Sequence, residues 1–380
     1  MSQSASQKVR VAVVGAGYWG INHVRTFARL EGCQLTRVCD VSEKNQQKAR
    51  GLAPGAKLGS SYEEILQDPE VDAVVLATPA VLHADQTLKA LAAGKHVFVE
   101  KPMALTVADA QAMADTARRN NRLLTIGVHN RFRPEAELLK RIIDDGQLGR
   151  VYYAKVSLFR RRGIPGFGSW FTNKDLAGAG ALFDIGVHMV DLAVWLMGSP
   201  RPVSVMGATY SEFGPRGLGL GGWGADAPAS GHVPQGARFD VDDLAAGMVR
   251  FDNGATLMVD ISWAGHVPSE ERLQILGTDA GAELHIPDRF GSTAPPLKLY
   301  HDFAGQPMES FPSIPGLPGG ESPQSRQLAN IVAAIRGEAL LRTTAAQCVE
   351  ITAILAALQD SAAQTRSADV RLPASERLPV

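Results

Sequence analysis

Cysteine is scarce in this chain. Three cysteines occur among 380 residues, at Cys33, Cys39 and Cys348. Their wide spacing gives neither a disulfide framework nor a Cys-x-x-Cys pair that could bind a metal. Scattered thiols of this kind fit a reducing compartment, so we expect a cytoplasmic protein. The histidines are scattered as well, and the sequence predicts no metal site.

The chain also lacks an excess of either charge and lacks long apolar runs. Its 38 Lys and Arg residues nearly balance its 39 Asp and Glu residues, which gives a formal net charge of −1. This balance offers no electrostatic reason to expect nucleic acid or an anionic membrane as a partner. Residues 1–7 are polar, unlike the apolar core of a signal peptide. No window approaches the ~20 apolar residues of a membrane span, so no membrane association is expected.

The chain is long enough for two domains, and its pattern changes after Gly149. Before that point, short apolar strands alternate with helical patterns, which predicts an α/β domain with a doubly wound parallel sheet. Beyond it, longer strand-like runs with few helices predict an α+β domain with a large, mainly antiparallel open sheet. The predicted domains are residues 8–149 and 150–380, the second closed by helices at about 325–336 and 344–364. A loop rich in glycine and proline, 213–236, has no predicted role.

A glycine-rich segment follows the first predicted strand, Val9–Val14. Its glycines are Gly15, Gly17 and Gly20 in a G-x-G-x-x-G pattern, and a helical pattern comes next. In this strand–loop–helix order, Gly15 permits a tight turn, Gly17 lets a pyrophosphate approach the backbone, and Gly20 lets the helix pack on the strand. The helix N-terminus offers N–H groups and a positive dipole end to the phosphates. The segment therefore predicts a dinucleotide-binding site.

An acid, Asp40, ends the second predicted strand, 20 residues after Gly20. An acid at this place can bond the ribose hydroxyls of the adenosine half of a dinucleotide. Its carboxylate would also repel the 2′-phosphate of NADP, and no arginine stands next to it to offset the repulsion. We therefore predict NAD as the cofactor, preferred over NADP. The alternative is an aspartate that only closes a turn at the strand end.

A lysine stands at the end of another predicted strand. The apolar run 97–99 stops at Glu100-Lys101-Pro102, because proline cannot continue a central ladder. In open parallel sheets, ligands bind outside the carboxyl ends of the strands. A lysine placed there beside a nicotinamide could hold or protonate the oxygen of a reacting carbonyl. The alternative is a strand-end lysine that is simply solvated.

A second cluster of chemically active residues comes later in the chain. Asp184 and His188 are four residues apart, so on a helix they share one face. A histidine with a pKa near neutrality can take the hydroxyl proton as an alcohol loses hydride. The acid could fix the histidine tautomer or bind the same substrate. The alternative is a packed histidine with Asp184 as a helix cap.

Together these motifs resemble the Gfo/Idh/MocA family, named for glucose–fructose oxidoreductase, inositol dehydrogenase and a rhizopine-catabolism protein. The resemblance rests on Glu100-Lys101-Pro102, on Asp184-x-Gly186-x-His188 and on the glycine triplet, and it covers nearly the whole chain. It implies an N-terminal Rossmann domain and a C-terminal open sheet, through which members commonly form homodimers or homotetramers. It also implies NAD(P)-linked oxidation or reduction at a secondary carbon of a sugar, cyclitol or related polyol.

The resemblance assigns roles to residues of this sequence. Lys101 and His188 are the expected catalytic residues, and Asp184 is expected to orient the histidine or bind substrate. The expected cofactor contacts are Gly15, Gly17, Tyr18, Trp19, Gly20, Asp40, Thr78, Pro79, Leu82, His83, Glu100, Lys101, Asn130 and Arg131. The expected substrate contacts are Lys101, Arg131, Trp170, Asp184 and His188. Trp170 precedes the helix of the second cluster and could stack on a sugar ring or the nicotinamide, or serve only in packing.

The sequence thus predicts a cytoplasmic, homo-oligomeric, NAD-dependent dehydrogenase of a sugar, cyclitol or polyol. One alternative is a nucleotide-sugar or sugar-acid oxidoreductase of biosynthesis. Another is a non-catalytic dinucleotide sensor on the same fold, which regulates a partner. Such a sensor could discard Lys101 or His188, whereas this chain keeps both.

Overall fold

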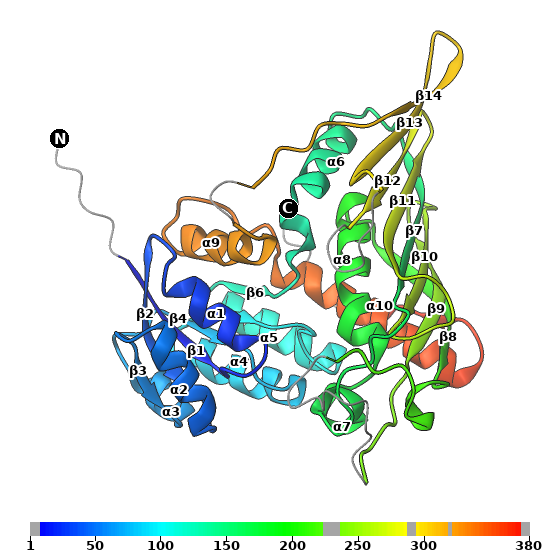
Figure 1. Cartoon of the computed structure of the whole chain (residues 1–380). Helices are drawn as coiled ribbons and strands as arrows, with labels where there is room; N and C mark the ends of the chain where they lie inside the picture. Colours follow the sequence, from blue (N-terminus) through cyan, green and yellow to red (C-terminus); the bar gives the residue numbers. More distant parts are fainter. Residues whose placement is uncertain (1–7, 223–235, 287–293, 318–320, 374–380) are drawn as a thin grey trace, which may run out of the picture. The chain divides into compact units, whose positions relative to one another are not determined.

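The structure is a computed structural model that describes residues 8–222, 236–286, 294–317 and 321–373 (Figure 1). Contacts divide the chain into two compact units. The first unit comprises Met1–Val128 and Ser322–Val349, and the second comprises His129–Glu321 and Glu350–Val380. These units differ from the predicted ranges in two segments. Residues 129–149 group with the second unit, and residues 322–349 group with the first.

The first unit contains a sheet of six strands in the order β3-β2-β1-β4-β5-β6. The strands are β1 (Val9–Val14), β2 (Cys33–Cys39), β3 (Lys57–Gly59), β4 (Ala73–Leu76), β5 (His96–Val99) and β6 (Leu124–Ile126). Every pair is parallel. The predicted doubly wound parallel sheet is therefore confirmed, and the carboxyl ends of its strands meet at one edge.

Helices connect these strands. They are α1 (Gly20–Phe27), α2 (Glu43–Leu52), α3 (Tyr62–Gln67), α4 (His83–Ala92) and α5 (Val107–Arg119). Another helix of this unit, α9 (Pro323–Ile335), comes from the later part of the chain and connects none of these strands. Neither α2 nor β3 was predicted, because α2 is polar and buries only Ala49, and β3 is three residues long with none of them buried. Figure 1 shows α9 beside α1. Leu328, Ile331 and Val332 of α9 join the same apolar core as Val24 of α1, which explains why this late segment groups with the first unit.

The second unit is built on a nine-stranded sheet in the order β14-β13-β12-β11-β7-β10-β9-β8-β15. The strands are β7 (Val151–Phe159), β8 (Pro202–Tyr210), β9 (Leu244–Phe251), β10 (Thr256–Ser262), β11 (Glu270–Gly277), β12 (Ala280–His285), β13 (Leu297–Phe303), β14 (Gln306–Ser310) and β15 (Ala368–Asp369). The pair β7–β10 is parallel, and the other pairs of the described strands are antiparallel. The predicted large, mainly antiparallel sheet is confirmed, although β12, β14 and β15 were not predicted.

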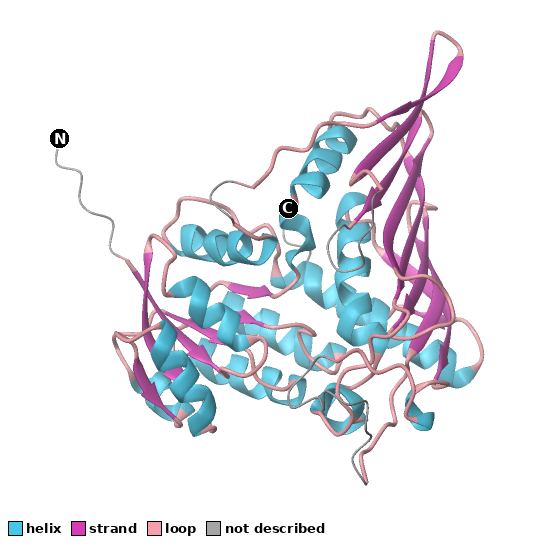
Figure 2. Cartoon of the chain, viewed as in Figure 1, coloured by secondary structure: helices cyan, strands magenta, loops and turns pink. Residues whose placement is uncertain are grey.

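Helices lie along one face of this sheet (Figure 2). They include α6 (Pro134–Asp144), α8 (Val187–Leu196) and most of α10 (Ala345–Gln364), while the short α7 (Lys174–Ala177) precedes a π-helical turn, Leu182–Gly186. Two glycines let α10 approach the sheet. A Cβ atom at Gly207 or Gly247 would lie 2.9 or 2.6 Å from atoms of Leu358. The helical face of the sheet is therefore the core of the unit.

The expectation that no stretch of the chain approaches the length of an apolar membrane span needs correction. The stretch Lys174–Leu196 is long and apolar enough to cross a membrane by composition alone. However, 89% of its apolar window is buried inside the structure, as expected for a core helix. Of the predicted loop 213–236, residues 223–235 lie outside the described part of the chain. Leu220, before that part, forms an isolated bridge with Ile164.

Candidate active site

The glycine triplet forms the loop between β1 and α1. Gly15 has a φ of +85°, and a Cβ atom there would lie 2.6 Å from the carbonyl oxygen of Ala77. A Cβ atom at Gly20 would lie 1.8 Å from the carbonyl oxygen of Gly15. At Gly17, by contrast, a Cβ atom would meet nothing within 4 Å. Gly15 and Gly20 thus permit the packing, and Gly17 borders open space where a pyrophosphate could approach the backbone.

Asp40 lies at the same edge, directly after β2. Its Oδ2 accepts a hydrogen bond from the N–H of Ala16 at 2.6 Å, and its Oδ1 accepts one from the N–H of Ser42 at 2.8 Å. The carboxylate is therefore fixed against the glycine loop and also closes the turn. The side-chain amide of Asn45 also donates to Oδ1 and Oδ2 of this carboxylate, at 3.3 and 3.2 Å. An ionised carboxylate accepts about four hydrogen bonds, so a ribose hydroxyl would take the place of the Asn45 amide on Asp40. The residues of the first unit fit a dinucleotide.

The loop after β4 holds the next group of predicted cofactor contacts. The hydroxyl of Thr78 donates to Oε1 of Gln86 on α4 at 2.6 Å. Pro79 follows, and Leu82 and Tyr18 are exposed, whereas Trp19 is half-buried. These side chains belong to the loops at the carboxyl ends of β4 and β1. Their predicted contacts with a cofactor stay predictions.

The prediction that His83 contacts the cofactor requires a correction. The side chain of His83 is 0% exposed, and both ring nitrogens face backbone carbonyl oxygens. Nδ1 lies 2.8 Å from the oxygen of Pro102, and Nε2 lies 2.9 Å from that of Thr78. Burial lowers the pKa of the imidazole. The ring is enclosed by the first unit, so His83 supports two loops and does not face a cofactor.

Glu100 is also buried rather than open to a cofactor. Its Oε1 lies 2.7 Å from Nε2 of His23 on α1, and its Oε2 accepts the N–H of Lys101 at 3.2 Å. The following peptide, Lys101–Pro102, is cis. His23 was not among the predicted residues of the site. Its position three residues after Gly20, on the first turn of α1, was the available signal. Lys101 itself is half-buried at the carboxyl end of β5.

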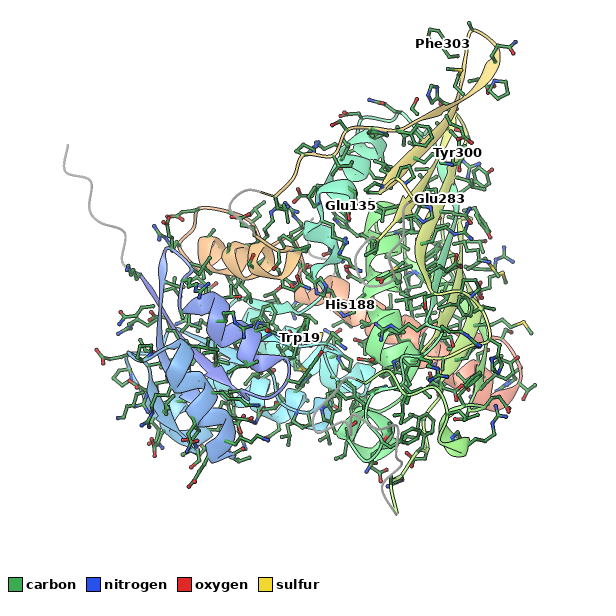
Figure 3. All side chains as sticks on the ribbon, in the orientation of Figure 1. Trp19, Glu135, His188, Glu283, Tyr300 and Phe303 are labelled. Atoms are coloured by element: carbon green, nitrogen blue, oxygen red, sulfur yellow. The ribbon has the colours of Figure 1, made fainter. Side chains whose placement is uncertain are left out.

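In the second unit, Asp184 and His188 lie where a π-helical turn passes into α8. Figure 3 labels His188, which is half-buried, and its ring centroid is 4.9 Å from that of His129. The indole Nε1 of Trp263 donates to Oδ2 of Asp184 at 2.8 Å. Asp184 is not a helix cap, because its own N–H already bonds the carbonyl of Gly180 within the helix. Single π-turns inside helices are frequent at functional sites.

A second aspartate, Asp242, anchors the start of this helix. Its Oδ1 accepts the N–H of Gly180 at 2.9 Å, and its Oδ2 accepts that of Leu182 at 3.1 Å. The side chain of Gln359 on α10 donates to the same carboxylate at 2.9 Å. Burial raises the pKa of Asp242. Asp242 was not predicted, because it lies about 60 positions from the helix that it caps.

The remaining predicted contacts differ in burial: Arg131 and Asn130 are buried, whereas Trp170 is half-buried. The guanidinium of Arg131 is 1% exposed and bonds both carboxylate oxygens of Asp191, at 2.9 and 2.6 Å. This geometry favours a structural role over the predicted contact with cofactor or substrate. Asn130 is buried beside it. The rings of Trp170 and Phe171 are stacked at 3.9 Å, so Trp170 offers a half-buried aromatic surface.

A glycine loop, Asp40 and Lys101 at one edge of a six-stranded parallel sheet are typical of an oxidoreductase that uses a dinucleotide. Comparison with models of protein families indicates the same class of protein. Residues 9–128 match the oxidoreductase family with an NAD-binding Rossmann fold, Gfo/Idh/MocA, and residues 137–283 match a Gfo/Idh/MocA C-terminal domain. The chain belongs to the Gfo/Idh/MocA family. This membership confirms the predicted class, an NAD-dependent oxidoreductase that acts on CH–OH groups of sugars or related polyols.

Two relatives and one solved structure illustrate the range of the similarity. D-glucoside 3-dehydrogenase of Escherichia coli K12 is 31% identical, over 81% of this chain and 83% of its own. A putative UDP-kanosamine synthase oxidoreductase subunit of Amycolatopsis mediterranei is 32% identical, over 68% of this chain and 69% of its own. The structure of a levoglucosan dehydrogenase in complex with NADH matches with a TM-score of 0.81 at 23% identity, covering 96% of this chain and all of that one.

Proposed function

We propose that this enzyme oxidises a secondary ring hydroxyl of a glucoside, free sugar or cyclitol and prefers NAD over NADP. The position of Lys101 carries this proposal. The parallel order of β1 and β5 puts this lysine at the same sheet edge as the glycine loop, where a dinucleotide is expected. The carboxylate of Asp40, fixed beside that loop, supports the preference for NAD.

In the proposed reaction, Lys101, His188 and Asp184 have separate roles. A bound NAD would supply the acceptor for the hydride that leaves the oxidised carbon. Lys101 holds the oxygen of that carbon and stabilises the negative charge that develops on it. His188 takes the hydroxyl proton as general base. Asp184, already oriented by the indole of Trp263, binds a neighbouring hydroxyl or orients His188.

A second candidate function has specific support. The relative described as a UDP-kanosamine synthase oxidoreductase subunit favours a nucleotide sugar as the substrate. The D-glucoside 3-dehydrogenase favours a simple glycoside instead. A diphosphate group would need cationic partners near the sugar. The fully buried Arg131 already pairs with Asp191, so we rank the simple sugar first.

A substrate panel tests this proposal. The panel contains methyl D-glucosides, levoglucosan, inositols, sugar acids and UDP-glucose, each with NAD and with NADP, followed at the absorbance of reduced nicotinamide. We expect turnover with at least one uncharged sugar or cyclitol. Turnover with UDP-glucose alone would support the second candidate. NAD binding by calorimetry without turnover on the whole panel would contradict an enzyme and support a dinucleotide sensor.

We further propose a homodimer or homotetramer, formed through the outer face of the nine-stranded sheet, in the cytoplasm. Met206, Met248 and Met258 are directly opposite one another on β8, β9 and β10. They face away from the helices, because Gly207 and Gly247 face α10. The Met206 side chain is 58% exposed. A row of flexible apolar side chains on an open sheet face is suited to contact with a second copy.

A further inference from the structure

We propose that two buried histidines of the first unit, His23 and His83, are positioning residues that hold Lys101 in place for hydride transfer. The inference rests on the proposed function, in which Lys101 stabilises the reacting oxygen. His23 contacts Glu100, the residue before the lysine, and His83 contacts Pro102, the residue after it. The backbone of Lys101 is thus held from both sides.

The contact on the His23 side passes through a buried carboxylate. His23 is buried on α1, its ring packs edge-on against Phe98, and its Nε2 lies 2.7 Å from Oε1 of Glu100. The other oxygen of Glu100 accepts the N–H of Lys101. A Cβ atom at Gly127, after β6, would lie 2.7 Å from that oxygen, so the glycine keeps the space for the carboxylate. This arrangement connects the helix after the glycine loop with the lysine.

The contact on the His83 side is made with backbone alone. Nδ1 faces the carbonyl of Pro102, and Nε2 faces the carbonyl of Thr78. Thr78 follows β4, and β4 pairs with β5, the strand that leads to Lys101. His83 therefore ties the loop after β5 to the loop after β4. A neutral imidazole donates from one nitrogen and an imidazolium donates from both, so at least one of these carbonyls receives a hydrogen bond.

Both histidines are enclosed, so neither can reach a substrate. Their effect on catalysis must pass through the lysine that they flank. The lysine ammonium sits at the end of a flexible four-carbon stem, and its position depends on where the backbone starts that stem. A displacement of about 1 Å at a reacting group can lower a rate by roughly 10²-fold. Loosening either flank should therefore lower turnover more than cofactor affinity.

Matched amide substitutions separate the two nitrogens of each ring. A glutamine amide nitrogen can take the place of histidine Nε2, and an asparagine amide nitrogen that of Nδ1. His23→Gln keeps the contact with Glu100, whereas His23→Asn loses it. His83→Asn keeps the contact with Pro102, whereas His83→Gln keeps only that with Thr78. We expect kcat to fall at least about tenfold in the variants that lose contact and to stay within about threefold in the others.

NAD affinity by calorimetry should stay within about threefold in all four variants. The same substitutions in a Lys101→Ala background should leave kcat unchanged, because the residue on which they act is gone. If the histidine substitutions lowered kcat in the Lys101→Ala background by the same factor as in the wild-type background, the positioning role would be overturned. If Lys101→Ala itself kept full turnover, the proposed function would fail, and that result is distinct from failure of the positioning role.

A measurement without NAD gives an independent readout. Trinitrobenzenesulfonate modifies lysine amines, and peptide mapping reports the rate at Lys101 relative to that at Lys89, which is exposed and pairs with Asp85 at the surface. We expect this ratio to change at least about threefold in His23→Asn and His83→Gln and to stay near wild type in His23→Gln and His83→Asn. An unchanged ratio in the two contact-losing variants would contradict the proposal.

His96 supplies a control on the same strand. It is half-buried at the opposite end of β5, where its Nδ1 accepts the N–H of Leu123. His96→Leu should lower the melting temperature and leave kcat and the labelling of Lys101 unchanged. If it lowered kcat as much as His23→Asn does, general loosening would explain both results and the proposal would be overturned. If the His83 variants do not fold, the His23 pair decides.

Discussion

Lys101, His188 and Asp184 carry the proposed chemistry, and substitution of each should change the kinetics in a different way. His188→Ala removes the general base, so kcat should fall by roughly 10²–10⁴ while NAD affinity changes little. Lys101→Ala should be at least as damaging, because it removes charge stabilisation and positioning together. Steady-state kinetics across pH and calorimetry with NAD measure both effects. Near-normal turnover of His188→Ala across pH would make His188 a packed histidine and the mechanism wrong.

Asp184→Asn should be milder than His188→Ala. The carboxylate accepts the indole N–H of Trp263, and an asparagine can keep that bond through its carbonyl oxygen. If Asp184 only orients His188, kcat should fall modestly. If it also binds a substrate hydroxyl, KM should rise. Unchanged kcat and KM would remove Asp184 from the site.

Asp40 should decide the choice of cofactor. Its carboxylate, fixed against the loop of Ala16, would meet the 2′-phosphate of NADP with like charge. We expect kcat/KM with NAD to exceed that with NADP by at least about tenfold, which corresponds to ~1.4 kcal/mol. Asp40→Ala should narrow the gap and also weaken NAD binding, because the loop loses its anchor. Equal efficiency of the wild-type enzyme with both cofactors would refute this prediction.

At the scale of elements, Gly17 should be the one glycine of the triplet that tolerates a side chain without a change of fold. A Cβ atom there meets nothing within 4 Å, so Gly17→Val should fold normally, and it should weaken NAD binding strongly by filling the approach to the pyrophosphate. Gly55→Val is a matched control, since a Cβ atom there also meets nothing. Calorimetry measures NAD affinity, and circular dichroism checks the fold. Unchanged affinity in Gly17→Val would refute the assignment of this loop.

The π-helical turn depends on the carboxylate of Asp242. Asp242→Ala leaves the N–H groups of Gly180 and Leu182 without this acceptor, which should lower the free energy of unfolding by about 1–3 kcal/mol. Urea denaturation measures this loss. Asp175→Ala, at an exposed position on α7, should change the free energy of unfolding by no more than about 0.5 kcal/mol. A loss in Asp242→Ala no larger than that of the control would contradict the anchoring role.

At the scale of the whole molecule, the outer face of the nine-stranded sheet should be covered by a second copy. Light scattering at micromolar concentration should show a dimer or tetramer. Met248→Arg puts a charge in the centre of the methionine row, because Met248 lies between Met206 and Met258, and it should shift the protein toward monomer. Leu340→Arg, at an exposed site of the first unit, is the control. A wild-type monomer under these conditions would count against the interface.

The hairpin of β13 and β14 adds exposed apolar side chains to the same unit. Figure 3 shows Tyr300 and Phe303 on β13, with Phe303 toward the hairpin end. Phe303 is 69% exposed. The row of methionines and this hairpin belong to one sheet, in which β12, β11 and β7 lie between them. The sequence did not predict this hairpin, because the side chains of β14 are mostly exposed and show no apolar alternation.

The sequence by itself determined the features that depend on local patterns. The glycine loop, Asp40 and Lys101 each follow directly from a strand end, and parallel strands bring such ends to one edge. The longer strand-like runs after Gly149 likewise predicted a large, mainly antiparallel second sheet, although β12, β14 and β15 of that sheet were not predicted. The position of Asp184 on a helix was also predictable, although the π-turn was not, since its cap comes from Asp242 far along the chain.

Only the tertiary structure decided which polar residues are enclosed. His83 and Glu100 were predicted to contact the cofactor because they follow β4 and β5 at the expected sheet edge. Both are buried instead: Glu100 contacts His23 on α1, and His83 contacts the backbone carbonyl of Pro102. Arg131 pairs with Asp191, 60 positions away, and α9 returns to pack on α1. Contacts of this range leave no local periodicity in the sequence, because each partner is chosen by packing between elements rather than by its neighbours in the chain.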